Sequence, residues 1–260
     1  MIGLERVAKT YRTQRGELVH ALEDIDLEVR ENEFVTLVGA SGCGKSSLLK
    51  LIGGLVPPTR GTIRIRGRAL DGPYSDVGFV FQEALLLPWR SVLDNVLFSI
   101  EMLGLDRRRY RERAMELLHL AGLAGFETKY PRELSGGMQQ RVAICRALVH
   151  EPGLLLMDEP FGALDALTRE EMGLELLRIW EEHPKTVVFV THSIPEAILL
   201  ADRVVVMTPR PGRIARVLEV ELPRPRRVDL EFDDRFKAYS DQVRSLIFAP
   251  RRGARDVAHV

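Results

Sequence analysis

Cysteine is scarce in this 260-residue sequence, which contains only Cys43 and Cys145. Two thiols are too few for the disulfide framework of a small secreted domain, so we expect a reducing, cytoplasmic setting. The sequence also lacks any apolar run approaching the ~20 residues that a helix needs to cross a bilayer, and its N-terminus does not resemble a signal peptide. We therefore expect that any work at a membrane depends on a partner that holds the protein there.

Net charge is absent as well, because 37 Lys and Arg residues balance 37 Asp and Glu residues. This balance argues against nucleic acid or an anionic surface as partner. The contents of hydrophobic residues (45%) and charged residues (28%) are ordinary for a soluble globular chain. A chain of this length can bury a sizeable core and lies near the size at which single cores begin to divide.

The most informative segment that is present is Gly39–Ser46, which fits the phosphate-loop pattern G-x-x-x-x-G-K-S. It follows an apolar, β-branched run at Glu33–Gly39 that predicts a buried strand, and it runs into Lys45–Ile52, whose spacing predicts a helix. Backbone N–H groups of such a loop and the N-terminus of its helix bind phosphate oxygens. The sequence therefore predicts that this chain binds a nucleoside triphosphate.

Two side chains of the loop have specific expected roles. Lys45 would reach the β- and γ-phosphates, and the Ser46 hydroxyl would ligate Mg²⁺. The nucleotide-binding residues expected in this segment are Gly39, Ala40, Ser41, Gly42, Cys43, Gly44, Lys45, Ser46 and Ser47.

Two carboxylates end another apolar strand, predicted at Gly153–Asp158. The carboxyl ends of parallel strands face the ligand crevice, so we expect Asp158 beside Ser46, holding Mg²⁺ through water. Glu159 follows directly, where a base could orient and polarise a water in line with the γ-phosphate. Solvated acids that simply end a strand are the alternative interpretation of this pair.

A second element that favours anions is Leu134–Arg141, in which Ser135-Gly136-Gly137 precedes a helical run at Val142–Val149. Small residues ahead of a helix leave its N-terminal N–H groups free for an anion, and the Ser135 hydroxyl adds a donor. One nucleotide could use both phosphate-seeking elements if they came from different subunits.

Strand and helix patterns alternate along the rest of the chain, and fully apolar strands separated by helices indicate a parallel sheet covered on both faces. We expect an α/β core with an antiparallel β subdomain at 1–90 and 150–222, a helical insert at 91–149, and an extension at 223–260. That extension would hold an amphipathic helix and a disordered basic tail from Arg251. Further expected strands are Ile2–Ala8, Leu22–Val29, Thr62–Arg66, Val77–Phe81, Thr186–Thr191, Arg203–Thr208 and, after a turn at Pro209–Arg213, Ile214–Leu222; expected helices are Leu167–Glu182, Pro195–Ala201 and Asp234–Phe248.

With these motifs in this order, the chain resembles the ATP-binding cassette (ABC) ATPases, which power membrane transporters, over nearly its whole length. The resemblance implies the P-loop NTPase fold of that family, an α/β fold with a mostly parallel core sheet, an N-terminal antiparallel β subdomain and a helical insert. Four more positions match the family: Tyr11 the aromatic that stacks on adenine, Gln82 the glutamine that touches Mg²⁺ and the transmembrane partner, Asp165 the loop that crosses between subunits, and His192 the switch histidine that faces the γ-phosphate.

The resemblance also implies a head-to-tail homodimer with two ATP molecules sandwiched between subunits. Each ATP would touch Lys45 and Ser46 of one subunit and the Ser135 segment of the other. The implied catalytic residues are Glu159, His192, Lys45 and Gln82; the implied Mg²⁺ ligands are Ser46, Gln82 and Asp158; and the implied contacts across the dimer are Ser135, Gly136, Gly137, Gln139 and Asp165.

Finer likeness points to one branch of the family. Gln82–Asn95, Asp158–Asp165 and Thr191–Ala197 resemble the bacterial importers for nitrate, sulfonates and taurine. This implies a peripheral subunit on the cytoplasmic face of the inner membrane, working with integral-membrane permease subunits and an external solute-binding protein. Apolar Leu85–Trp89, beside Gln82, is the expected dock for a permease helix; a loop tucked onto its own core is the alternative.

Three other functions are weighed against an importer. An exporter ATPase would not work with an external binding protein. A nucleic-acid-associated cassette should show coiled-coil insertions, zinc-type cysteine pairs or two cassettes, and the sequence has none of these. A scaffold that binds but barely hydrolyses nucleotide is disfavoured by the presence of Glu159 and His192.

Overall fold

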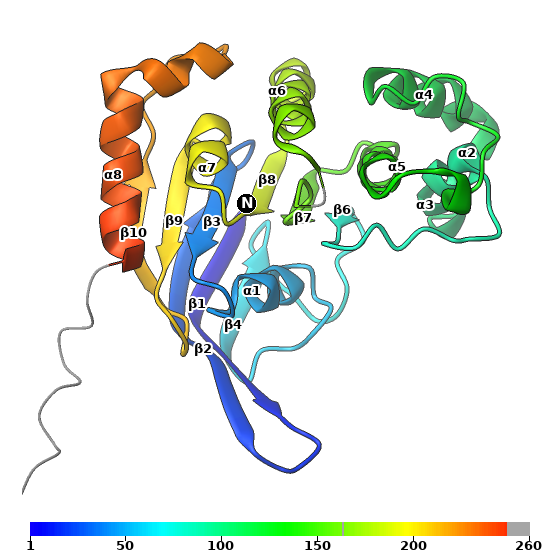
Figure 1. Ribbon diagram of the computed structural model, residues 1–260. Coiled ribbons are helices and arrows are strands. Elements are labelled where there is room, and N and C mark those ends of the chain that lie inside the picture. The colour runs from blue at the N-terminus through cyan, green and yellow to red at the C-terminus, as the bar shows by residue number, and fades with distance from the viewer. Residues whose placement is uncertain (163, 249–260) are drawn as a thin grey trace, which may run out of the picture.

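The computed structural model describes residues 1–162 and 164–248, which form two β-sheets surrounded by helices (Figure 1). The larger sheet has six strands in the order β10-β9-β3-β8-β7-β6, all parallel except β10 at one edge. The strands are β3 (Phe34–Gly39), β6 (Val77–Val80), β7 (Leu154–Asp158), β8 (Thr186–Val190), β9 (Arg203–Met207) and β10 (Ile214–Glu219). The parallel sheet predicted from the apolar runs is therefore confirmed.

The smaller sheet is antiparallel, with four strands in the order β2-β1-β4-β5. Its strands are β1 (Ile2–Arg12), β2 (Leu18–Val29), β4 (Arg60–Ile65) and β5 (Arg68–Ala69). The predicted strands were too short, since β1 was expected to end at Ala8 and β2 to begin at Leu22. The β1–β2 register shifts between Leu4 and Thr10, and such bulges change the phase of the inside–outside alternation, so the sequence pattern fades before the strand ends.

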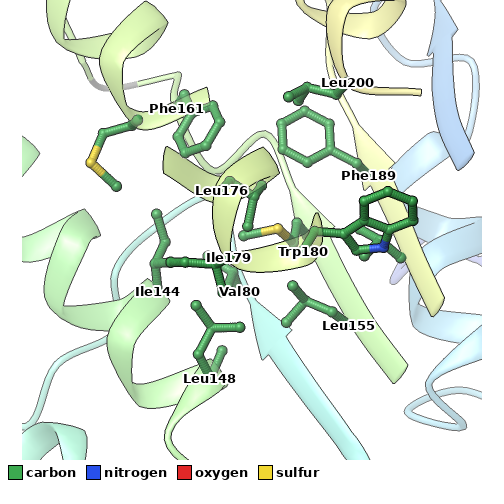
Figure 2. Close-up of a cluster of buried hydrophobic side chains, with 14 of the residues drawn as sticks. Val80, Ile144, Leu148, Leu155, Phe161, Leu176, Ile179, Trp180, Phe189 and Leu200 are labelled. Atoms are coloured by element: carbon green, nitrogen blue, oxygen red, sulfur yellow. The ribbon is translucent and has the colours of Figure 1, made fainter. Parts of the chain in front are cut away.

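Different elements cover the two faces of the large sheet. The helix α1 (Lys45–Ile52) and the small sheet pack on one face, and α6 (Ala166–Glu182) and α7 (Ile194–Leu200) lie on the other (Figure 1). Figure 2 shows part of the hydrophobic core on the α6 and α7 face, where Trp180 of α6 and Phe189 of the strand β8 lie among aliphatic side chains. Because successive strand residues point to opposite faces, burial of both faces explains why β3, β7 and β8 are apolar almost throughout.

The helical insert joins β6 to β7 and lies beside the sheet (Figure 1). Its helices are α2 (Val92–Val96), α3 (Phe98–Met102), α4 (Arg107–Leu120) and α5 (Gly136–Leu148), with a 3₁₀ turn η1 (Pro131–Glu133) before α5. Side-chain caps mark the starts of α2, α4 and α5; at α4, Asp106 accepts a hydrogen bond from the N–H of Arg108 (3.0 Å). The helical prediction for this region is confirmed, and the division of the chain at residues 90, 150 and 222 stays a prediction.

After β10, a 3₁₀ turn η2 (Val228–Phe232) leads to the amphipathic helix α8 (Asp234–Phe248), which packs against α7 and β9. Buried Arg226 donates hydrogen bonds to the carbonyls of Ile198, Leu199 and Ala201 at the end of α7, and burial lowers its pKa to about 10. The basic tail predicted from Arg251 lies outside the described residues. Within 1–162 and 164–248, no helix combines the length and the apolar character needed to span a membrane.

Candidate nucleotide site

The phosphate loop turns sharply between β3 and α1. Gly44 caps α1 at a φ of 108°, a left-handed conformation that favours glycine, and a Cβ there would lie 2.6 Å from Leu22 Cδ2. Lys45 is buried under the loop, where its Nζ donates to the carbonyls of Gly39 (2.9 Å) and Ala40 (3.2 Å). The loop therefore curls around the Lys45 ammonium group, and the contact of Lys45 with the β- and γ-phosphates stays a prediction.

Two of the three expected Mg²⁺ ligands, Ser46 and Asp158, meet at the base of the loop, and the third, Gln82, contacts Glu159. Ser46 Oγ donates a hydrogen bond to Asp158 Oδ1 at 2.8 Å. Burial raises the pKa of Asp158, the hydrogen bond from Ser46 opposes that rise, and the nearby charge of Glu159 adds to it. A bound cation would favour the ionised form of this carboxyl group, so the buried acid fits a site that a metal ion completes.

The donor set also fits Mg²⁺ in particular. Mg²⁺ takes hard oxygen ligands, keeps several waters, and is commonly held by one or two carboxylates together with substrate phosphates. The Ser46 hydroxyl and the Asp158 carboxylate are two such oxygens. In the described part of the chain, no cluster of three or more His, Cys, Asp or Glu side chains could hold a metal. Because Mg²⁺ takes six oxygen ligands, Ser46 and Asp158 would hold the ion together with water and the phosphates of a nucleotide.

Three predicted residues meet at the carboxyl edge of the large sheet, each just after a different strand. Glu159 follows β7, and its Oε2 lies 3.3 Å from Nε2 of Gln82, which follows β6. The same oxygen lies 3.4 Å from Nδ1 of His192, which follows β8. Because β6, β7 and β8 are neighbours in the sheet, the strand order brings these side chains together.

Tyr11 reaches the site from the long part of β1 that the sequence pattern missed. Its hydroxyl donates to Ser47 Oγ at 3.2 Å, so it stands beside the first turn of α1. One pocket joins these elements, and its lining residues are Tyr11, Val19, Ala21, Ser41, Gly42, Gly44, Lys45, Ser46, Ser47, Gln82, Glu159, His192 and Arg210. Three residues of the phosphate loop, Gly39, Ala40 and Cys43, are not among the residues that line the pocket, and the Cys43 side chain is buried.

The signature segment and Asp165 lie outside this pocket. Ser135 caps α5 by accepting a hydrogen bond from the N–H of Met138 (3.3 Å), and Gln139 Nε2 donates to the carbonyl of Pro131 (3.0 Å). Asp165 caps α6 through the N–H of Thr168 (3.0 Å), a bond that lowers its pKa. The fold thus separates Ser135, Gly136, Gly137, Gln139 and Asp165 from the phosphate loop of the same chain.

Sequence reasoning missed Glu196, the third residue of α7. Burial raises the pKa of its carboxyl group, which accepts a hydrogen bond from Thr191 Oγ1. The same Thr191 oxygen accepts a bond from the N–H of Ser193 at 2.9 Å. These bonds hold the turn that carries His192. An acid in the first turn of a helix is common enough that the sequence alone gave no reason to single it out.

Sequence reasoning also missed Arg210, which lines the pocket from the turn between β9 and β10. The Pro-Arg-Pro-Gly composition predicts a turn and indicates nothing about where that turn lies. Its position beside the phosphate loop is set by sheet pairing, since β9 is the direct neighbour of β3.

The apolar loop beside Gln82 is divided between core and surface. We call Gln82–Trp89 the docking segment. Leu85 and Trp89 are 55% and 71% exposed, whereas Leu86 packs against the main core. The alternative of a loop tucked onto its own core holds for Leu86 only, and docking of a permease helix at the exposed residues stays a prediction.

The helix α5 holds the docking segment by its backbone. Arg146 donates to the carbonyls of Ala84 (2.8 Å) and Leu85 (2.9 Å), and Gln140 donates to the carbonyl of Phe81 (3.0 Å) just before the segment. The same helix begins at the signature segment. A single rigid element thus links the exposed loop to the predicted dimer contacts.

Known proteins resemble this chain in both sequence and structure. It is 53% identical to an uncharacterized ABC transporter ATP-binding protein of Methanocaldococcus jannaschii, over 84% of this chain and 82% of that protein. It is 46% identical to a taurine import ATP-binding protein of Rhizobium johnstonii, over 96% and 92% of the two chains. A solved ATP-binding cassette, in a dimeric post-hydrolysis state bound to ADP and Pi, superposes with a TM-score of 0.77 at 36% identity, covering 86% of this chain and all of that one.

The family described as ABC transporter matches residues 22–162, which run from β2 through the phosphate loop and the helical insert to the end of the Asp158-Glu159 motif. The structural likeness confirms the fold expected from the sequence. The chain therefore belongs to the ABC transporter family, as one of its ATP-binding, ATP-hydrolysing subunits.

Proposed function

We propose that this chain is the ATPase subunit of an importer for taurine or a similar small sulfonate, acting as a homodimer at the cytoplasmic face of the inner membrane. The hydrolytic part rests on one observation: Glu159, Gln82 and His192 converge beside the Ser46–Asp158 pair. The assignment of the cargo is supported by the relative from Rhizobium johnstonii, which is named for taurine import and aligns with this chain over nearly its whole length.

In the proposed reaction, Lys45 and the loop N–H groups bind the β- and γ-phosphates. Ser46 and Asp158 would hold Mg²⁺, which when bound would neutralise charge on the phosphate oxygens. Glu159 accepts a hydrogen bond from the attacking water and polarises it in line with the γ-phosphate. Gln82 and His192 contact one oxygen of the Glu159 carboxylate, which fixes its direction and leaves the other oxygen for the water.

In the proposed homodimer, the signature segment of one subunit completes the nucleotide site of the other. Ser135 and Gly137 lie outside the pocket that Lys45 and Ser46 line. Their place at the N-terminus of α5 suits them to bind the γ-phosphate held by a second copy. The dimeric state of the similar solved cassette supports this arrangement.

The docking segment is the proposed contact for the permease, with Leu85 and Trp89 as its apolar anchors. Exposed aromatic anchors often carry much of the binding energy of a protein interface. Leu86 is unsuited to this role because it packs in the core.

We expect the double variant Leu85→Asp and Trp89→Ala to lower cargo uptake in proteoliposomes about 10-fold or more, because anchor residues each contribute about 2 kcal/mol or more. Basal ATP hydrolysis by the isolated subunit should be unchanged, since neither side chain lines the nucleotide pocket. A matched control is Leu18→Asp with Phe248→Ala. These two side chains are exposed to a similar degree and lie outside the docking segment. Normal uptake by the docking variant would refute this contact.

The cargo is tested on the solute-binding protein that co-purifies with this chain and its permease. We expect taurine or an alkanesulfonate, at ~100-fold above its dissociation constant, to add about 2.7 kcal/mol to the stability of that binding protein, seen as a higher melting temperature. Stabilisation only by nitrate, pyrimidines or flavins would contradict the sulfonate assignment. Absence of any binding protein from the purified complex would favour an exporter.

A further inference from the structure

We propose that Arg210 binds a phosphate oxygen of the nucleotide, as a second cationic contact beside Lys45. Arg210 lies outside every motif used above, in the turn Pro209–Arg213 between β9 and β10. The proposal rests on the proposed nucleotide site, because it assumes that the pocket holds the triphosphate. Three observations carry it: where the turn lies, where the guanidinium points, and the lack of an acidic partner.

The turn is held to β2 by backbone hydrogen bonds, and it packs directly on the phosphate loop. Gly212 donates its N–H to the carbonyl of Ala21 (2.9 Å), and its own carbonyl accepts from the N–H of Glu23 (3.0 Å). The approach to the loop is so close that a Cβ on Gly212 would lie 2.0 Å from the carbonyl oxygen of Cys43. The turn and the loop therefore form one packed unit, and side chains of the turn keep a defined position relative to the phosphates.

The Arg210 guanidinium lies on the loop itself. Its Nη2 and Nε lie 3.1 and 3.3 Å from the carbonyl oxygen of Gly42, and the side chain lines the same pocket as Tyr11 and Lys45. One neutral carbonyl uses only part of the five-donor fork of an arginine. The remaining N–H groups are available for phosphate, which arginine recognises with two parallel hydrogen bonds.

The charge of Arg210 also lacks a carboxylate partner. Its neighbour in the turn, Arg213, pairs with Glu23 at 2.9 Å. In the described part of the chain, by contrast, no acidic side chain forms an ion pair with Arg210. An unpaired cation at the wall of a pocket built for a triphosphate raises the affinity for that anion. Arg213, with its charge satisfied outside the pocket, is the matched control.

The test is titration calorimetry on the full chain with ATP, ADP and adenosine, in the presence of EDTA so that no hydrolysis occurs. We expect Arg210→Ala to weaken ATP and ADP binding about 10-fold while adenosine binding stays within 2-fold, because a charge-assisted hydrogen bond is lost. Arg210→Lys should recover part of the loss, and the difference from wild type should shrink at high salt. Arg213→Ala should bind all three ligands like wild type.

Two results would overturn the proposal. Unchanged ATP affinity in Arg210→Ala, or equal weakening of ATP and adenosine, would mean that Arg210 only supports the Gly42 carbonyl. The variant Lys45→Ala separates this failure from failure of the site itself. If Lys45→Ala weakens ATP binding and Arg210→Ala does not, only the role of Arg210 is wrong. If neither variant weakens it, the nucleotide site is wrong as well.

Discussion

Replacing Glu159 with glutamine should lower the rate of ATP hydrolysis about 1000-fold, within the range of 10² to 10⁴ expected for loss of a general base. Glutamine has nearly the same shape, so contacts with Gln82 and His192 can persist. ATP should still bind, because Lys45 and Ser46 are untouched. Since the γ-phosphate is then not cleaved, a stable ATP-bound dimer should accumulate. Phosphate release measures the first effect, and size-exclusion chromatography with ATP measures the second.

The control for Glu159→Gln is Glu151→Gln. Both glutamates have a left-handed backbone, with φ of 47° and 53°, and they flank opposite ends of β7. Glu151 is exposed and away from the nucleotide pocket, so its variant should turn over ATP at the wild-type rate. Near-normal hydrolysis by Glu159→Gln would remove Glu159 from the role of base.

Replacing Ser135 with arginine should lower ATP hydrolysis about 100-fold, the cost of losing one preorganised donor to a transition-state charge. ATP binding by the monomer should be unchanged, because Ser135 does not line the pocket of its own chain. For the wild type, activity per subunit should rise steeply with protein concentration until the dimer forms. Hydrolysis assays over a dilution series, with the molecular mass followed by light scattering, measure both effects.

Loss of a helix cap is a separate effect of the Ser135 variant and needs its own control. Asp106 caps α4 of the same insert in the same way, so Asp106→Arg removes a cap without touching the signature segment. It should retain wild-type hydrolysis. Full activity of a verified wild-type monomer, independent of concentration, would contradict the dimer.

Much of the fold could be predicted because its signals are local. The apolar runs at β3, β7 and β8 indicate buried strands without any partner being known, and the phosphate loop is recognisable from its glycines and Lys45. The ends of β1 and β2 were predicted wrongly, because they depend on the register of strand pairing. The bulges of β1 and β2 shift side chains between faces, and these shifts depend on cross-strand pairing that a single sequence does not display.

The same contrast between local signals and long-range packing applies to the predicted site. Glu159 was predicted because it directly follows an apolar strand, whereas Gln82 and His192 were predicted from the resemblance to the ABC ATPases. The strand order explains why the three side chains lie together, since parallel strands present such residues at one edge. Arg210 was missed because its distance from Gly42 results from the pairing of β9 with β3, more than 160 positions apart in the sequence. Glu196 was missed because burial, which gives it its character, is a property of the packed fold.

The hydrogen bonds from α5 to the docking segment have a thermodynamic consequence. Arg146 and Gln140 tie the loop to the helix that begins at Ser135, so we expect a shift of the loop to be passed on to the helix N-terminus. A partner that prefers one orientation of the loop then also selects one orientation of the signature segment. Binding free energies are reciprocal: whatever factor the proposed permease applies to ATP affinity, ATP applies to the affinity for that permease. In the proposed importer, cargo-dependent rearrangement of the membrane domains would thereby change the affinity for a nucleotide that the cargo does not contact.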